Sequence, residues 1–177
     1  MGFSNVWISW IMQCVSSINY HVLVNNDSVG PITPLCGLRQ GDPLSPYLYI
    51  ICLEGLSSYI RHHENNGLIH ETRICRGSPS ITHLLFAYDS FLFCKATISE
   101  VTTLKNILDT YETASGQAIN YQKSSIVFSR NTNSTLQNNI IHLLGVVETM
   151  GYGKYLGLPS MVERDKKSIF TFIKERI

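Results

Sequence analysis

Asp89 is the first residue of this sequence whose type and setting, a carboxylate between two apolar runs, could do chemistry. Two apolar runs, residues 84–86 and 91–94, flank the segment Ala-Tyr-Asp-Ser at 87–90, whose residue types favour a turn. The pattern predicts a buried β-hairpin over residues 81–95 that presents Asp89. A solvated turn aspartate on a core hairpin explains the same residues without any chemistry.

A glycine-rich loop is the second candidate for chemistry. Residues 37–46 read Gly-Leu-Arg-Gln-Gly-Asp-Pro-Leu-Ser-Pro, and their glycines let a backbone approach a polyanion closely. Arg39 offers a guanidinium for phosphate, and Gln40 offers an amide for a base or sugar. The opposing interpretation is a plain loop that leads into a helix, with Asp42 as a structural turn acid.

The elements that must position these residues alternate without the regular rhythm of a doubly wound sheet. Apolar residues at three- and four-residue steps predict helices with one buried face, and short apolar or alternating runs between turn residues predict strands. The helix that follows an N-cap at Ser45 is apolar nearly all round in its first two turns, which predicts a central place in the core. We expect an α+β fold with a small, mainly antiparallel sheet and packed helices. Expected helices cover residues 3–18, 46–63, 98–115, 134–144 and 166–177, and expected strands cover 20–25, 30–35, 68–75, 84–86, 91–94, 125–129 and a short pair within 152–159.

Composition narrows the class of protein. A length of 177 residues with 44% hydrophobic content is that of one globular domain with a core. The longest apolar run, residues 47–53, is far shorter than the roughly 20 residues that a membrane span needs, so no membrane partner is expected. Five cysteines without CxxC spacing fit a reduced, intracellular compartment, and the histidines lack the partners of a zinc site. A net charge of +1 is small for a nucleic-acid binder.

Four sequence segments resemble motifs of the plant-type non-LTR (LINE-type) reverse transcriptases, and they follow one another in the same order as in that family. The segment 86–89, Phe-Ala-Tyr-Asp, is similar to the F-A-D-D hairpin of that family, and residues 37–46 are similar to its R-Q-G-D-P-L-S-P block. Residues 115–125 resemble the S-G-x-x-x-N-x-x-K-S segment through Ser115-Gly116-Gln117, Asn120 and Lys123-Ser124-Ser125. Residues 154–159 resemble the K-Y-L-G-L-P segment. Together the blocks cover nearly the whole chain.

The resemblance implies an architecture and a set of roles. Residues 1–145 would form a partial polymerase palm, and residues 146–177 would begin a thumb-like region. An RNA template, a DNA primer and Mg²⁺ at Asp89 are implied, with the rest of the polyprotein as a further partner and the nucleus as a place of work within the cell. Arg39, Gln40, Gly41 and Lys123 would face the template or the incoming nucleotide, and Tyr155, Leu156 and Gly157 would lie on the primer side. Lys123 also fits a plain surface lysine, and Tyr155 and Leu156 also fit core positions.

The sequence departs from the family at the catalytic position itself. The family's hairpin carries two adjacent aspartates, and here the first of them is Tyr88. A neutral phenol cannot replace a carboxylate at a Mg²⁺ site. The family's third carboxylate lies on a strand upstream of the helix with which this chain begins. We therefore expect an RNA-directed DNA polymerase domain without activity, in which metal binding at Asp89 is weak or lost.

Two other interpretations stay open at this point. The domain could serve as a non-catalytic module that binds nucleic acid or a protein through the surface that holds the template in the family. Residues 1–99 carry only five Lys and Arg side chains, which disfavours a strong electrostatic grip on nucleic acid. Alternatively, the chain is part of a longer gene product that encodes the upstream strand, and then only Tyr88 stands against activity.

Overall fold

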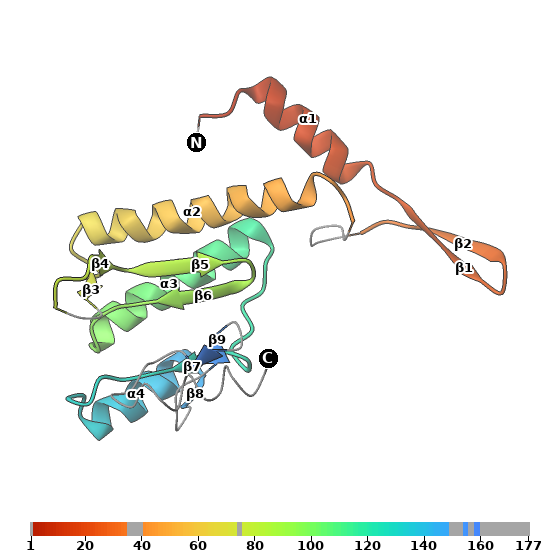
Figure 1. The fold of residues 1–177 in the computed structure, drawn as a ribbon. Coiled ribbons are helices and arrows are strands. Elements are labelled where there is room, and N and C mark those ends of the chain that lie inside the picture. The colour runs from red at the N-terminus through yellow and green to blue at the C-terminus, as the bar shows by residue number, and fades with distance from the viewer. Residues whose placement is uncertain (1, 35–40, 74–75, 149–153, 156–157, 160–177) are drawn as a thin grey trace. The chain divides into compact units, whose positions relative to one another are not determined.

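The structure is a computed structural model that describes residues 2–34, 41–73, 76–148, 154–155 and 158–159. The chain divides into two compact units, residues 1–49 and residues 50–177. Each unit is described by itself, and the elements of both are drawn in Figure 1.

Unit 1 is built from a helix and a hairpin. Helix α1 (Asn5–Ser16) begins after Ser4, whose hydroxyl accepts a hydrogen bond of 3.3 Å from the backbone N–H of Trp7. Strands β1 (Tyr20–Val24) and β2 (Asp27–Ile32) pair antiparallel around a two-residue turn. The turn residues Asn25 and Asn26 have φ of 53° and 69°, a left-handed conformation that asparagine tolerates and that matches the twist of the strands. The expected first helix and first hairpin are confirmed, but the second strand was expected at 30–35 and lies at Asp27–Ile32, because the turn takes two residues rather than four.

The apolar face of α1 is exposed, which corrects the expectation of a wide buried face. No residue of α1 is buried, and Trp10 keeps 63% of its surface accessible. Strand β2 is exposed throughout, and β1 is exposed except at the half-buried Tyr20. A helix and one two-stranded hairpin present too little apolar surface to enclose each other.

Unit 2 has a hydrophobic core between two helices and a second hairpin. Helix α2 (Ser45–Asn65) starts in the last residues of unit 1 and continues through unit 2, and helix α3 spans Ile98–Ser115. Strands β5 (His83–Phe86) and β6 (Asp89–Leu92) form the hairpin. The fully buried residues of α2 lie in its middle, whereas its first turns, expected to be central to the core, are at most half-buried, with Tyr47 at 66% and Ile50 at 59% exposure. The core consists of Leu56, Ile60, Ile69, Leu104 and Ile107, with Leu85, Leu92, Cys94, Leu108 and Tyr111 packed against it.

The remaining elements complete an α+β fold, as the sequence predicts. Helix α4 spans Ser134–Leu144, and its last turn is tied to α3 because Lys105 Nζ donates a 2.9 Å hydrogen bond to the carbonyl of Leu143. In the part of the chain that the structure describes, the strands form two-stranded pairs rather than one continuous sheet. The expected strand at 125–129 stops at Ile126, and the helix expected at 166–177 lies outside the described residues. Strands β3 (Thr72–Arg73) and β4 (Ser80–Ile81) pair antiparallel, as do β9 (Lys154–Tyr155) and β10 (Leu158–Pro159), and β7 (Ser125–Ile126) pairs parallel with β8 (Val147–Glu148).

A buried carboxylate, that of Glu100 in the first turn of α3, joins three segments of unit 2. Its side chain is only 8% exposed. Glu100 Oε2 accepts hydrogen bonds from the backbone N–H of His70 at 3.1 Å and of Lys95 at 3.0 Å, and Oε1 accepts one from His70 Nδ1 at 2.8 Å. The helix starts at the N-cap Thr97, whose hydroxyl accepts from the Glu100 N–H at 3.3 Å. The loop before β3, the end of the second hairpin and the start of α3 are thereby held together.

We expect Glu100→Gln to destabilise the protein by roughly 2–4 kcal/mol. Glutamine keeps the shape of the side chain, and its carbonyl oxygen can still accept from the two backbone N–H groups, but its N–H₂ group cannot accept from His70 Nδ1 and the charge that strengthens all three hydrogen bonds is lost. Urea unfolding followed by circular dichroism measures the change. The control is Glu71→Gln, the same chemical change at an exposed position beside His70, which should stay within about 0.5 kcal/mol of the unsubstituted protein. Equal effects of the two substitutions would contradict the role of Glu100.

Cys94 should be protected from alkylation in the folded protein. Burial, assisted by the carboxylate of Glu100, raises the pKa of the Cys94 thiol to about 11, so very little of the reactive thiolate is present at pH 8. Cys14 is exposed and serves as the internal control. Iodoacetamide treatment followed by peptide mass spectrometry should show modification of Cys14 while Cys94 stays unmodified until denaturant is added. Similar rates at both cysteines under native conditions would show that the core around Cys94 is open.

Candidate functional site

The hairpin of β5 and β6 carries the candidate metal ligand. Its register pairs His83 with Leu92 at the base and Phe86 with Asp89 beside the turn. The turn residues are Ala87 and Tyr88, and Ala87 has a left-handed φ of 48°. Asp89 is therefore the first residue of β6 rather than part of the turn. The hairpin itself is confirmed, but only one of its faces packs on the core.

The surroundings of Asp89 do not fit a resident divalent metal. Asp89 is exposed, and the adjacent Tyr88 is 89% exposed and carries a phenol, which is a poor ligand for a hard cation. Across the described residues, no group of three or more His, Cys, Asp and Glu side chains lies close enough together to hold a metal ion. Mg²⁺ takes oxygen ligands in near-ideal octahedral geometry and is rarely held by one exposed carboxylate alone. This donor set can attract a cation but cannot fix its position.

Lys123 lies in a tight turn that the preceding asparagine builds. The Lys123 backbone N–H donates to Asn120 Oδ1 at 3.0 Å and to the Asn120 carbonyl at 3.1 Å. Ser124 Oγ donates to the same carbonyl at 2.8 Å. The three-residue spacing of Asn120 and Lys123 thus has a local structural cause, and it presents Lys123 on an exposed loop. The role of the Lys123 side chain beside a nucleotide stays a prediction.

The residues just before the Lys123 turn are also fixed by local bonds. Helix α3 ends at Gly116, which has the left-handed φ of 70° that favours glycine, and its N–H donates to the carbonyl of Glu112. Ser115 Oγ accepts from the Gln117 N–H at 3.2 Å, and the Tyr111 hydroxyl donates to Gln117 Oε1 at 2.7 Å. The Ser-Gly-Gln segment therefore works as a helix stop that aims the chain into the Lys123 turn.

The loop at 37–46 is described only from Gly41 onward. Gly41 has a φ of 81° and belongs to unit 1, whereas Asp89 and Lys123 belong to unit 2. Asp42 is a structural turn acid, as expected, because its Oδ1 accepts from the Leu44 N–H at 3.0 Å and its carbonyl accepts from the Ser45 N–H at 3.1 Å. Ser45 is the first helical residue and not the expected N-cap.

The other predicted site residues can be placed only in part. Arg39, Gln40, Leu156 and Gly157 lie outside the described residues, and Tyr155 is described as part of β9.

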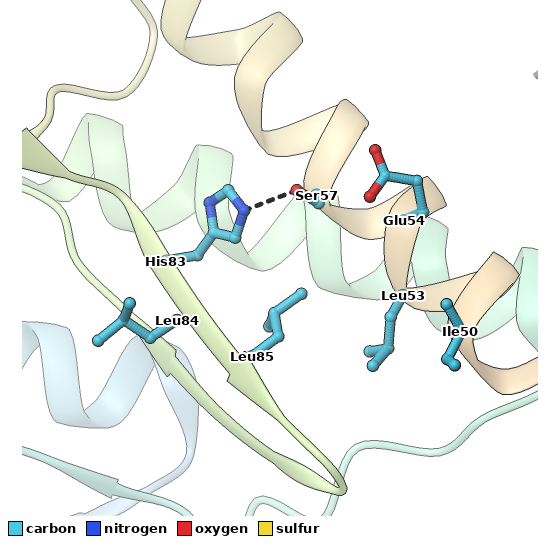
Figure 2. A pocket seen from close by; sticks show the side chains of 7 residues that line it. All are labelled: Ile50, Leu53, Glu54, Ser57, His83, Leu84 and Leu85. Atoms are coloured by element: carbon cyan, nitrogen blue, oxygen red, sulfur yellow. Dashed lines mark hydrogen bonds between the residues drawn. The ribbon is translucent and has the colours of Figure 1, made fainter. Parts of the chain in front are cut away.

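A pocket that sequence reasoning missed lies between α2 and β5. It is open, with a volume of about 320 Å³, and Figure 2 shows its lining. Two polar residues that face each other across it, Ser57 on α2 and His83 on β5, are joined by a hydrogen bond of 2.8 Å. Neither Asp89 nor Lys123 lines it. A histidine at the start of an otherwise apolar strand was the signal in the sequence that could have pointed to this pair. The lining residues are Ile50, Leu53, Glu54, Ser57, His83, Leu84 and Leu85.

Comparison with known proteins gives a family for the chain. The family model described as reverse transcriptase (RNA-dependent DNA polymerase) matches residues 1–159. An uncharacterized mitochondrial protein from Arabidopsis thaliana is 48% identical over 68 residues, which are 38% of this chain and 56% of that protein. The chain therefore matches just over half the length of this relative. None of the described helices is long and apolar enough to cross a membrane.

Asn120→Ala should loosen the turn that presents Lys123. One net hydrogen bond is worth about 1 kcal/mol, so amide exchange at Lys123 should accelerate about fivefold while global stability changes little. Hydrogen exchange followed by NMR measures the effect. Gln122→Ala, at the neighbouring exposed position, is the control and should leave the Lys123 amide unchanged. If Asn120→Ala behaved like Gln122→Ala, the side-chain bond would not hold the turn.

Proposed function

Because the chain belongs to the reverse transcriptase (RNA-dependent DNA polymerase) family, we propose that it is a LINE-type reverse transcriptase domain that has lost polymerase activity. The LINE-type assignment rests on the order of the hairpin, the 37–46 loop, the 115–125 segment and the 154–159 segment along the chain. Residues 1–145 correspond in this proposal to the palm and residues 146–177 to the start of the thumb.

The observation that carries the proposal is Tyr88 at the turn beside Asp89. Nucleotide addition by the family uses divalent metal ions, and a two-metal site needs several carboxylates placed around ions about 4 Å apart. The phenol of Tyr88 is uncharged at neutral pH and is a poor ligand for a hard cation. With one exposed carboxylate left on the hairpin, loss of metal positioning should lower the rate by several orders of magnitude.

The architecture around the hairpin supports descent from a working polymerase domain. The inner face of the hairpin packs through Leu85 and Leu92 on a core shared by α2 and α3. The Asn120 turn still presents Lys123 on the surface. In this proposal the family motifs keep their local structure while the metal ligand at position 88 is replaced.

The family implies nucleic-acid binding, and we propose an RNA template and a DNA primer as its partners. In this proposal Arg39, Gln40, Gly41 and Lys123 face template or nucleotide, and Tyr155, Leu156 and Gly157 face the primer. The rest of the polyprotein of an intact element would be a further partner. For location we propose the interior of the cell, with the nucleus as the site of family activity; the similar Arabidopsis protein is described as mitochondrial, which makes that organelle a second place to look.

Primer extension on an RNA template with Mg²⁺ tests the proposal. The proteins to compare are the chain itself, its Tyr88→Asp variant, and that variant joined at its N-terminus to the family's first catalytic strand. We expect extension only by the third protein, because it alone has carboxylates on both strands. Tyr88→Phe, which stays neutral, is the matched control and should be as inactive as the unsubstituted chain. Extension by the unsubstituted chain would contradict the proposal.

Binding of the chain to an RNA–DNA hybrid separates the proposal from that of a retained binding module. A functional grip on nucleic acid predicts an affinity that falls steeply with salt, with a slope set by the number of phosphates contacted. We expect a shallow slope and weak affinity for this chain, because residues 1–99 carry few cations. Tight, salt-steep binding by an inactive chain would favour the binding module.

A further inference from the structure

A continuous chain of hydrogen bonds links β5 to α2 at the base of the hairpin. Ser57 Oγ lies 2.8 Å from His83 Nε2, as the dashed line in Figure 2 shows, and Thr82 Oγ1 lies 3.0 Å from His83 Nδ1. Thr82 Oγ1 donates at 3.2 Å to Glu64 Oε2 of α2. Ser57 and Thr82 are only 5% and 6% exposed, so each hydroxyl depends on these bonds for a partner.

The direction of each hydrogen bond in this network can be assigned from the chemistry of the four side chains. A carboxylate can only accept hydrogen bonds, so the Thr82 hydroxyl donates its hydrogen to Glu64. Its oxygen must therefore accept a hydrogen bond from His83 Nδ1–H. In the neutral ring, Nε2 then carries a lone pair that accepts the hydrogen of Ser57. With a neutral imidazole, the two ring nitrogens of His83 and the hydroxyl hydrogens of Ser57 and Thr82 all have a hydrogen-bond partner. A second proton, on Nε2, would leave the buried Ser57 hydroxyl without its acceptor.

The electrostatic surroundings of His83 also favour the neutral ring. Burial lowers the pKa of His83 below its ordinary value, and the positive charge of Arg61 lowers it further. Glu64 and Glu54 oppose this shift but do not outweigh it. Within the described part of the chain, the charged groups that act on His83 thus all come from α2. Glu54 and Arg61 are 3.6 Å apart and both more than half exposed, so solvent screens their influence.

From this geometry we infer that His83 is a positioning residue that holds the base of the Asp89 hairpin on helix α2, and that it does so in its neutral form. His83 pairs with Leu92 at the end of the hairpin opposite to Asp89. The chain of bonds therefore fixes the root of the hairpin while the turn projects into solvent. The importance of this anchor for the polymerase fold rests on the proposed function, whereas the anchor itself is tested on the hairpin alone.

The sign of the pH dependence follows from linkage. A histidine whose pKa is lower in the folded than in the unfolded state stabilises the fold above its ordinary pKa of about 6.5, and this stabilisation is lost as the pH falls through the folded pKa. Acidification should loosen the hairpin of β5 and β6 and leave the hairpin of β1 and β2 unchanged.

Hydrogen exchange of the full chain between pH 7.5 and pH 5.5 tests the inference. After correction for intrinsic exchange, amides of β5 and β6 should exchange about fivefold faster at the lower pH, which corresponds to one hydrogen bond. The ring of His83, followed by its own NMR signal, should titrate below the ordinary value. A ring that titrates at or above that value, or loosening that is equal in both hairpins, overturns the inference.

Two variants separate positioning from simple packing. His83→Asn keeps an amide donor toward Thr82 but cannot titrate, so the hairpin should show a flat pH profile. Ser57→Ala removes the partner of Nε2 and should give fast exchange at both pH values. A hairpin that keeps the full pH response in His83→Asn would overturn the assignment to His83. If either variant fails to fold, the titration of the unsubstituted protein decides alone. Primer extension has no part in this test, so its result leaves the proposed function separately testable.

Discussion

The buried carboxylate of Glu100 is the interaction on which the order of unit 2 depends most. Its two oxygens accept three hydrogen bonds, and these come from His70 before β3 and from Lys95 after β6. Burying a charge costs free energy unless the charged group is hydrogen-bonded. Loss of any of these three donors should therefore destabilise unit 2. The bonds fix the start of α3, and α3 then brings Leu104 and Ile107 onto the core against which the hairpin packs. Glu100 therefore affects the position of Asp89 indirectly, through α3 and the core on which the hairpin packs.

Much of the fold could be predicted from the sequence because most of its signals are local. The caps Thr97 and Asn133, the stops Gly116 and Gly145 and the turn at Asn25 and Asn26 each act within a few residues. Burial was predicted less well, because it depends on what lies opposite. The apolar face of α1 and the first turns of α2 were expected in the core, yet no residue of α1 is buried and the first turns of α2 are at most half-buried. Strand pairing is also non-local, which is why one sheet was expected where separate pairs occur.

In the candidate site, too, the features set by nearby residues were predictable, whereas those set by residues distant in sequence were not. The apolar runs and the turn residues between them predicted the hairpin that carries Asp89, and local turn chemistry explains why Asn120 precedes Lys123 by three residues. The pair Ser57 and His83 could not be found in this way, since 26 residues separate them and neither belongs to a motif. Two roles are thereby distinguished within one hairpin. Its base is held by a hydrogen-bonded polar network, whereas its turn presents Tyr88 beside the single carboxylate Asp89.

The central claim is that Tyr88 leaves the hairpin unable to hold a divalent ion. The most direct measurement is paramagnetic broadening of amide signals by Mn²⁺ in the chain and in its Tyr88→Asp variant, with the exposed Asp27 of β2 as an internal reference. In the unsubstituted chain, the amide signals of Asp89 and Ser90 should broaden no more than that of Asp27. In the variant they should broaden at lower Mn²⁺ and reach saturation. Saturable broadening at Asp89 in the unsubstituted chain, with the same midpoint as in the variant, would contradict the account.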